Sequence, residues 1–319
     1  MTIDPASLLI VGSLAFDDLD MPTGAFRDVL GGAATYASIA ASMLAPGRVR
    51  VVGIVGSDFP EPHLADLRER GIDTMGIERA SGQTFRWHGR YSSDLMTRTT
   101  LDTQLNVFAD FCPKIPRSYT DSRFVLLGNI HPKLQVDVLD QTRKPALIAA
   151  DTMNFWIERE PAALSEMLRR IDLLIINDEE VRQLSGRNNL VKAAAEVRRR
   201  GPKMLVVKRG EFGALLFDDV GTFFVPAYPL ESVVDPTGAG DSFAGGLMGY
   251  LTAQDDWSHN SLRRALFFAS ALGSFCVEGI GPGRLNEIDR SALGARIASF
   301  ARLVDYGGGL ALPGETRHS

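Results

Sequence analysis

The stretch VVDPTGAGDSFAGGLMGYL, residues 233–251, carries most of the information in this 319-residue chain. A turn that holds Pro236 and Gly238 leads into a run of small and apolar residues, which predicts a helix. Gly238, Ala239 and Gly240 let the backbone approach a ligand closely, and their N–H groups lie at the start of that helix. Free donors and the helix dipole favour a phosphate there. We therefore expect an anion hole at residues 238–240.

Asp241 stands at the mouth of this anion hole. A carboxylate in that place can accept the proton of a hydroxyl as the hydroxyl attacks a phosphoryl group, as the catalytic-loop Asp does in protein kinases. The alternative is that Asp241 is only the N-cap of the helix and the glycines form a tight turn. The residues alone allow both interpretations, and the family resemblance described below favours Asp241 as a general base.

Outward from this stretch, the chain alternates short apolar runs with longer amphipathic segments. The apolar runs are typical of buried strands in a parallel sheet: Leu8–Val11, Val49–Val55, Phe124–Leu127, Ala146–Ala150, Leu173–Ile176 and Met204–Val207. Helical spacing covers Ala33–Leu44, Pro62–Arg70, Ala162–Arg170 and Leu190–Arg200. This order predicts an α/β fold with a doubly wound, mostly parallel sheet and helices on both faces. Its ligands should bind at the carboxyl ends of the strands.

Two segments interrupt the alternation. In Thr84–Thr100, Phe85, Trp87 and Tyr91 alternate before a turn at Ser92–Asp94, which predicts a β-hairpin. The segment Phe16–Leu30 is polar and rich in turn residues. We expect a small β lid, made of segments of about 14–30 and 84–106, on a single domain that spans residues 1–319. An ordinary surface hairpin is the alternative, and residues 307–319 are expected to be a loose tail.

Composition excludes several classes of partner. The formal charge is −5 and basic residues are scattered, so no basic surface for nucleic acid or a membrane is expected. No apolar run is long enough to span a bilayer, and the start lacks a signal-peptide pattern. The two cysteines, Cys112 and Cys276, are too few for a disulfide framework. We expect a cytoplasmic protein that acts on a small molecule and has no P-loop.

Residues 235–243, DPTGAGDSF, resemble the C-terminal signature D-x-T-G-A-G-D-x-F of the PfkB/ribokinase family of carbohydrate kinases. The resemblance extends in the family's order over nearly all the chain. It implies a ribokinase-like fold and transfer of the γ-phosphate of MgATP to a hydroxyl group, with Asp241 as the base. Asp235 and Thr237 stand where potassium-activated relatives bind their cation, yet cation-independent relatives carry them too. A monovalent cofactor is thus left open.

On the nucleotide side, Asn177-Asp178-Glu179-Glu180 is similar to the family's N-x-x-E pattern. The resemblance assigns Asn177 to the phosphate region and Glu180 to Mg²⁺ through water, in accord with the few protein carboxylates that Mg²⁺ takes. A solvated acidic first turn of a helix is the alternative. The resemblance also assigns further residues to ATP: Lys208, Gly210, Gly213 and Ser270.

On the acceptor side, Val11-Gly12-Ser13 followed by Asp17 resembles the family's opening motif, which makes Asp17 a ligand of acceptor hydroxyls. Gly31 and Gly32 resemble the glycine pair that approaches the acceptor. Asn129, just after the strand Phe124–Leu127, is expected at the ligand crevice.

After the glycine pair the chain reads Ala33-Ala34-Thr35-Tyr36, without the lysine and asparagine of ribokinase-type sequences. Hydroxyl-reading sites discriminate through such polar groups, so ribose is disfavoured as the acceptor. Tyr36 either stacks on a ligand ring or packs in the core.

The leading hypothesis is a kinase for a sugar or cyclitol. A nucleoside kinase with the same machinery is the first alternative, and a catalytically idle sensor is the second. A sugar phosphate is a further possible acceptor, because arginine side chains bind phosphate well and the hairpin segment contains Arg86, Arg90 and Arg98. A homodimer is expected to be possible.

Overall fold

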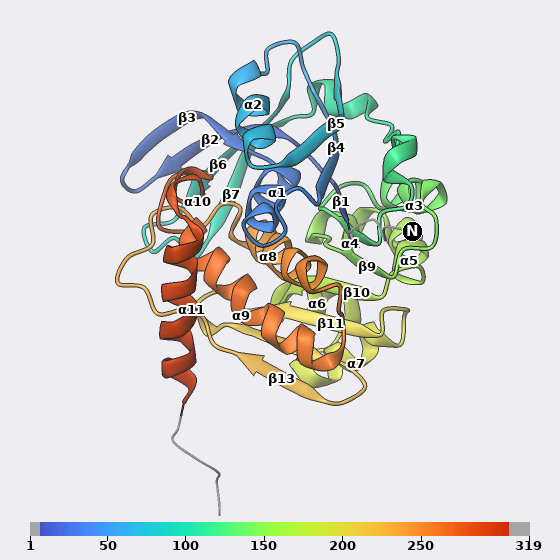
Figure 1. The fold of residues 1–319 in the computed structure, drawn as a ribbon, viewed down its shortest axis with the longest axis vertical. Helices are drawn as coiled ribbons and strands as arrows, with labels where there is room; N and C mark the ends of the chain where they lie inside the picture. Colours follow the sequence, from blue (N-terminus) through green and yellow to red (C-terminus); the bar gives the residue numbers. More distant parts are fainter. Residues whose placement is uncertain (1–6, 306–319) are drawn as a thin grey trace, which may run out of the picture.

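The computed structural model describes residues 7–305. Its main feature is a nine-stranded sheet in the order β13-β12-β11-β10-β9-β8-β1-β4-β5 (Figure 1). Neighbours from β11 to β5 run parallel, whereas β12 and β13 pair antiparallel at one edge. The strands are β1 (Leu8–Val11), β4 (Val49–Val55), β5 (Ile72–Arg79), β8 (Phe124–Leu127), β9 (Leu147–Ala150), β10 (Leu173–Asn177), β11 (Met204–Lys208), β12 (Ala214–Phe217) and β13 (Thr222–Val225). The predicted fold class is confirmed.

Helices cover both faces of this sheet, because alternate strand residues point to opposite sides. Leu8 and Ile10 pack in one apolar cluster and Leu9 and Val11 in the other. The first cluster draws on α1 (Ala33–Leu44), α2 (Glu61–Glu69), α8 (Ala239–Gln254), α9 (His259–Cys276), α10 (Gly283–Glu287) and α11 (Arg290–Val304). The second draws on α3 (Pro132–Gln141), α5 (Pro161–Leu168), α6 (Asp178–Ser185) and α7 (Leu190–Arg198), with α4 (Asn154–Arg159) beside it. No helix within residues 7–305 is long and apolar enough to cross a membrane.

A second sheet of four strands stands off the large one, in the order β3-β2-β6-β7 (Figure 1). It joins two antiparallel hairpins, β2 (Ala15–Met21) with β3 (Gly24–Gly31) and β6 (Phe85–Tyr91) with β7 (Arg98–Gln104), through a parallel β2–β6 pair. The hairpin expected in residues 84–100 is confirmed. The segment expected to be turn-rich at 16–30 is a hairpin too, since only its tip at Pro22 and Thr23 is a turn.

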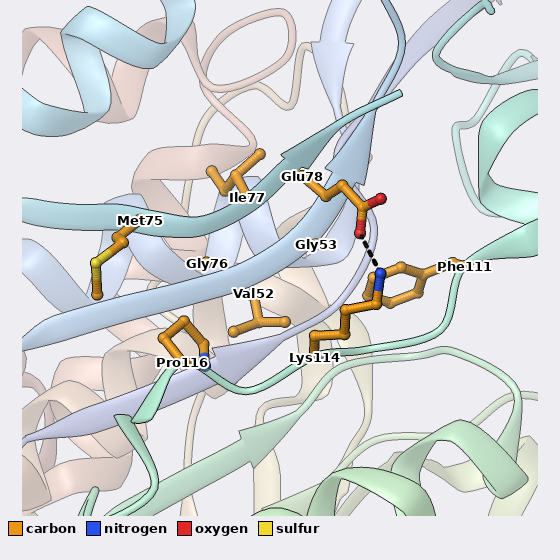
Figure 2. A pocket seen from close by; sticks show the side chains of 9 residues that line it. All are labelled: Val52, Gly53, Met75, Gly76, Ile77, Glu78, Phe111, Lys114 and Pro116. Atoms are coloured by element: carbon orange, nitrogen blue, oxygen red, sulfur yellow. Dashed lines mark ion pairs between the residues drawn. The ribbon is translucent and has the colours of Figure 1, made fainter. Parts of the chain in front are cut away.

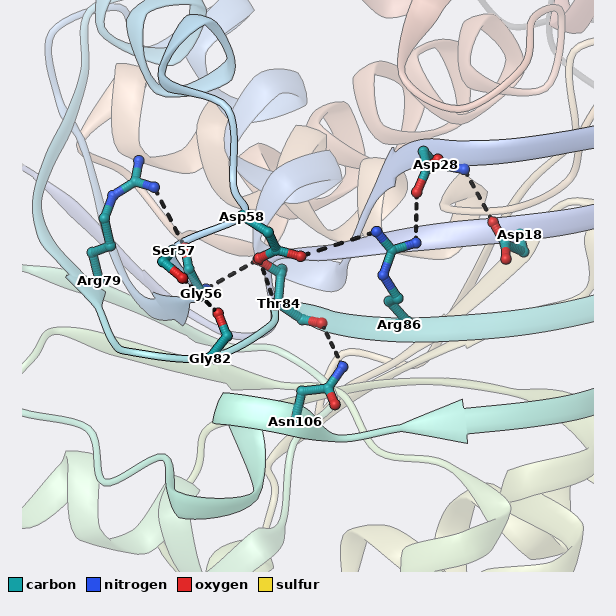
Figure 3. Close-up of polar contacts among 10 residues, drawn as sticks. All are labelled: Asp18, Asp28, Gly56, Ser57, Asp58, Arg79, Gly82, Thr84, Arg86 and Asn106. Atoms are coloured by element: carbon teal, nitrogen blue, oxygen red, sulfur yellow. Dashed lines mark hydrogen bonds and ion pairs between the residues drawn. The ribbon is translucent and has the colours of Figure 1, made fainter.

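The small sheet is anchored to the large one by a polar cluster around Thr84 (Figure 3). The Asp58 carboxylate accepts hydrogen bonds from the Thr84 N–H at 2.7 Å and the Thr84 hydroxyl at 2.6 Å. That hydroxyl accepts the N–H of Gly56 at 3.0 Å, and Asn106 donates to the Thr84 carbonyl at 2.9 Å. The chain is therefore tied to the loop after β4 where it enters β6 and where it leaves β7.

Candidate active site

Three polar side chains come together at the carboxyl edge of the large sheet. Asp151 follows β9, Asn177 ends β10 and Lys208 ends β11, and the last two are register partners. The Lys208 ammonium donates to Asp151 Oδ2 at 3.1 Å. This is the edge at which open parallel sheets bind their ligands.

Lys208 also reaches the glycine loop at the start of α8. A Cβ added to Gly240 would lie 2.9 Å from Lys208 Nζ, so the ammonium lies directly against that loop. Burial alone would lower the pKa of Lys208, but the carboxylates of Asp151, Glu180 and Asp241 outweigh it and raise the pKa. A permanent positive charge therefore lies beside the predicted anion hole.

Asn177 and Glu180 form a capping box at the start of α6. The Glu180 N–H donates to Asn177 Oδ1 and the Asn177 N–H donates to Glu180 Oε2, both at 2.8 Å. Glu180 is buried, and burial together with the charge of Asp151 raises its pKa. A buried acidic pair of this kind is stabilised by a cation.

The residues at this edge fit a hydrated Mg²⁺. Within residues 7–305 no group of three or more His, Cys, Asp or Glu side chains gathers as a metal cage. Asp151 and Glu180 instead offer two carboxylates, which is the usual number for a Mg²⁺ that keeps waters and binds nucleotide phosphates. Glu180 would hold the ion, and Asp151 would help to hold it because it lies at the same edge of the sheet.

The first turn of α8 places Asp241 inward. The N-cap of this helix is Gly238, with φ of 74°, and Asp241 is its third residue, so the interpretation of Asp241 as the N-cap is wrong. A Cβ on Gly238 would lie 2.4 Å from the ring of Tyr36, which also requires glycine there. The first N–H groups of α8 lack intrahelical partners. Burial, followed by the charge of Asp151, raises the pKa of Asp241 to about 6.

Asp235 holds the loop that precedes α8. Its Oδ1 accepts the N–H of Thr237 at 2.8 Å, and its Oδ2 accepts the N–H of Gly281 at 2.9 Å. The Thr237 carbonyl in turn accepts the thiol of Cys276 at 3.4 Å. The loop is thus fixed by backbone contacts to the segment after α9.

Asp17 lies on the inner face of β2 and is 5% exposed. A Cβ on Gly31 would stand 2.2 Å from Asp17 Oδ2, so Gly31 makes room for this carboxylate. Gly32, with φ of 95°, N-caps α1. Burial, followed by the charges of Asp235 and Asp241, raises the pKa of Asp17 to about 8. Asp18 points to the other face, where it accepts the N–H of Asp28 at 3.0 Å.

Two side chains of the small sheet face the same region as Asp17. Trp87 is the register partner of Asp17, and the Arg98 guanidinium carbon lies 5.2 Å from the Trp87 ring centroid. The charge of Arg98 counteracts the rise in the pKa of Asp17 and of Asp241. Arg98 of β7 thus supplies positive charge to the region around Asp17 and Asp241.

The remaining predicted residues make their contacts with other parts of the chain than the residues described above. The Asn129 amide oxygen accepts the Trp156 indole N–H at 3.0 Å, and the Ser270 hydroxyl donates to the Pro226 carbonyl at 3.1 Å. Gly210 and Gly213, both with positive φ, turn the chain from β11 to β12. Tyr36 is 1% exposed and packs in the core, so it does not stack on a ligand.

Two functional candidates were missed by the sequence reasoning. Asp151 directly follows the apolar run Ala146–Ala150, and the rule that places Asn177 and Lys208 at the ligand edge applies to it equally. Tyr91 was assigned only to the hairpin. Its hydroxyl lies 2.8 Å from Thr237 Oγ1, a contact between residues 146 positions apart that no local pattern signals.

A surface pocket beside β5 is separate from this site (Figure 2). It is lined mainly by apolar groups, with Lys114 and Glu78 paired at 3.7 Å on its rim. It contains none of the residues described above, and its lining comes from β4, β5 and the segment after η1 (Asn106–Asp110).

Comparison with known proteins connects this geometry to an activity. The model of the pfkB family carbohydrate kinases matches residues 8–289. A cytidine kinase of Thermococcus kodakarensis is 30% identical over 249 residues, which cover 76% of this chain and 88% of the relative.

Two solved structures share the fold. A Burkholderia thailandensis nucleoside kinase in complex with inosine superposes with a TM-score of 0.76 at 20% identity, covering 92% of this chain and 97% of that one. An E. coli protein described as a ribokinase II, in complex with ATP and Mg²⁺, superposes with a TM-score of 0.74 at 21% identity, covering 92% and 99%.

Proposed function

Because the chain belongs to the PfkB family of carbohydrate kinases, and is therefore an ATP-dependent phosphotransferase that acts on a hydroxyl group, we propose that it phosphorylates a nucleoside with Asp241 as the base. The observation that carries the chemistry is the placement of the half-buried Asp241 on the first turn of α8, next to Gly240 and the Lys208 ammonium. A proton acceptor, the N–H groups at the start of the helix and a cation meet there, although the Ala239 N–H already donates to the Pro236 carbonyl at 3.3 Å.

The reaction follows from these positions. Asp241 takes the proton of the acceptor hydroxyl as its oxygen forms a bond to the γ-phosphorus, while the bond from that phosphorus to the β,γ-bridging oxygen breaks and its electrons leave with ADP. The N–H groups of Gly238 and Gly240 and the Lys208 ammonium stabilise the charge on the transferring group, and the Ala239 N–H can join them only by giving up its hydrogen bond to the Pro236 carbonyl. Asp151 and Glu180 would hold Mg²⁺, which when bound would supply charge neutralisation to the phosphates.

Asp17 binds the acceptor. With a pKa of about 8 it is largely protonated at neutral pH in the empty site, so it can donate to an acceptor oxygen as well as accept from a hydroxyl. Gly31 and Gly32 bring the backbone close beside it. Asn129 and Ser270 are proposed as contacts of the acceptor and of the nucleotide, respectively.

A nucleoside is favoured by the cytidine kinase relative, which matches over most of both chains. In addition, Trp87 is the register partner of Asp17, so a flat base can pack beside a ribose held by Asp17. A sugar or cyclitol is the second candidate. Arg98 already covers the Trp87 ring at 5.2 Å, and a base would have to displace it, whereas a small polyol would not.

The small sheet acts as the lid of this site and excludes water during transfer. A cytoplasmic location is proposed because MgATP is supplied there, and Cys112 and Cys276 are both unpaired. The homodimer stays a prediction that light scattering in solution tests.

The deciding experiment measures ADP release from MgATP against nucleosides, pentoses, hexoses, inositols and sugar phosphates, beside an Asp241→Asn variant. We expect a nucleoside to drive release that the variant abolishes. Release with a sugar or cyclitol alone would replace the nucleoside by the second candidate. If no acceptor drives ADP release although ATP raises the melting temperature of the protein, the proposed catalysis is overturned.

The monovalent cation is tested in the same assay by replacing potassium with tetramethylammonium. Both oxygens of Asp235 already accept backbone N–H groups, which hold the loop. We therefore expect less than about a twofold loss of kcat, and a larger loss would place a cation among the cofactors.

A further inference from the structure

Tyr91 links the small sheet to the loop that carries the anion hole. It is the last residue of β6 and is 8% exposed, and its hydroxyl lies 2.8 Å from Oγ1 of Thr237, which is 9% exposed. Thr237 directly precedes Gly238, the N-cap of α8. Among residues 7–305, no other hydrogen bond joins the small sheet to residues 235–241.

The ring of Tyr91 is held rigidly. It packs with Leu19 and Met21 of β2, and Ile280, from the segment after α9, packs against the same cluster. The inner face of the small sheet therefore rests on the segment that also supplies the Gly281 N–H to Asp235. Displacement of the small sheet would carry the Tyr91 hydroxyl away from Thr237.

Thr237 is fixed from three directions. Its N–H donates to Asp235 Oδ1 at 2.8 Å and its carbonyl accepts from Cys276 at 3.4 Å, both within the large body of the protein. Only the third contact, made by its side chain to Tyr91, comes from the small sheet. The backbone that leads into the anion hole thus depends on where the small sheet lies.

We propose that Tyr91 is a positioning residue, which through Thr237 aligns the 238–240 anion hole when the small sheet closes over the acceptor. It acts through Thr237 and need not touch the substrate. The inference rests on the proposed phosphoryl transfer and deepens it, because it makes the alignment of the anion hole conditional on the seating of the small sheet. ATP bound without an acceptor would then meet a loop that lacks its third support, which limits wasteful hydrolysis.

The test compares Tyr91→Phe, Thr237→Val and Thr237→Ser in the ADP-release assay with the acceptor that the panel identifies. Tyr91→Phe keeps the ring and removes the hydroxyl. We expect kcat to fall about tenfold, near the upper limit for one neutral hydrogen bond, while KM for the acceptor changes by less than about twofold. Thr237→Val should match it, the double variant should be no worse than either, and Thr237→Ser should retain wild-type kcat.

Tyr119→Phe is the matched control. Tyr119 is also buried, and its hydroxyl donates to the Asp73 carbonyl at 3.2 Å, far from the site. The Tyr119→Phe variant should have a lower melting temperature than the wild type and an unchanged kcat. The inference is overturned if Tyr91→Phe keeps wild-type kcat, if it raises only KM, or if its effect adds to that of Thr237→Val. Failure of the wild type to turn over any acceptor would instead count against the proposed function.

Discussion

The two halves of the site differ in how their carboxylates are balanced. On the proposed nucleotide half, the charge of the partly buried Lys208 acts on both Asp151 and Glu180, and these residues lie at or just after the carboxyl ends of β9, β10 and β11. On the acceptor half, Asp17 is buried near Asp235 and Asp241, and the cation that acts on it, Arg98, belongs to the small sheet. The nucleotide half therefore carries its own countercharge, whereas the acceptor half depends on a second element and on the acceptor itself.

Asp241, where the two halves meet, gives the largest expected effect. Asp241→Asn should lower kcat by about 10² to 10⁴, the usual contribution of a positioned base, and leave the melting shift caused by MgATP intact. Since the base must be ionised and its pKa is raised to about 6, the wild-type kcat should rise with pH through about 6. Unchanged turnover, or loss of nucleotide binding as well, would contradict the role.

A substitution of Lys208 tests whether this one cation balances the negative charge of Asp151 and Glu180. Lys208→Met removes the charge beside Gly240 and leaves two buried carboxylates unpaired, which destabilises a protein by about 3–5 kcal/mol. We expect a fall in kcat/KM for ATP of about 10²-fold and a lower melting temperature, with partial recovery of stability at high Mg²⁺. Lys203→Met, a change on the exposed surface at the opposite end of β11, is the control. An equal loss of kcat/KM for ATP in Lys208→Met and Lys203→Met would contradict the role of Lys208 beside the nucleotide.

Arg98 tests the dependence of the acceptor half on the small sheet. Arg98→Met should raise KM for the acceptor or lower kcat by about tenfold, since a charge acting on Asp17 and Asp241 is lost. The matched control is Arg90→Met, because Arg90 pairs with Asp20 at 3.2 Å rather than with the site carboxylates. Similar kinetics for the two variants would show that the Arg98 charge does not act on catalysis.

Asp17 gives the smallest effect, on stability rather than rate. Its folded pKa of about 8 lies above the unfolded 3.8, so the folded state binds the proton more tightly and stability falls as pH rises from about 4 to 8. Asp17→Asn should remove this loss and raise the melting temperature at pH 8 by about 2 °C, while acceptor affinity drops. Asp18→Asn, on the opposite face of β2, should leave the pH slope unchanged.

Six strands of the large sheet were predictable because they are short runs of buried residues, and each of them agrees with the structure within one residue. The edge strand β5 was missed because most of its residues are only partly buried or exposed. The antiparallel strands β12 and β13 were not predicted, since they lie at an edge and carry exposed residues such as Phe224.

The site was predictable where a residue follows a strand or belongs to the glycine loop, as with Lys208 and Asp241. Contacts that depend on how two distant elements pack, such as Tyr91 with Thr237, leave no trace in local sequence. The same holds for the pKa of Asp17, because it depends first on burial in the folded protein and then on carboxylates more than 200 positions away in the chain.

Helices α1 and α8 approach each other closely at two glycines of α8. A Cβ on Gly245 would lie 2.1 Å from the Ala37 carbonyl, and one on Gly249 would lie 2.7 Å from Ala41 Cα. One helix starts at Gly32 beside Asp17 and the other at Gly238 beside Asp241. A larger residue at Gly245 or Gly249 would therefore push the two helices apart and with them the segments that carry Asp17 and Asp241.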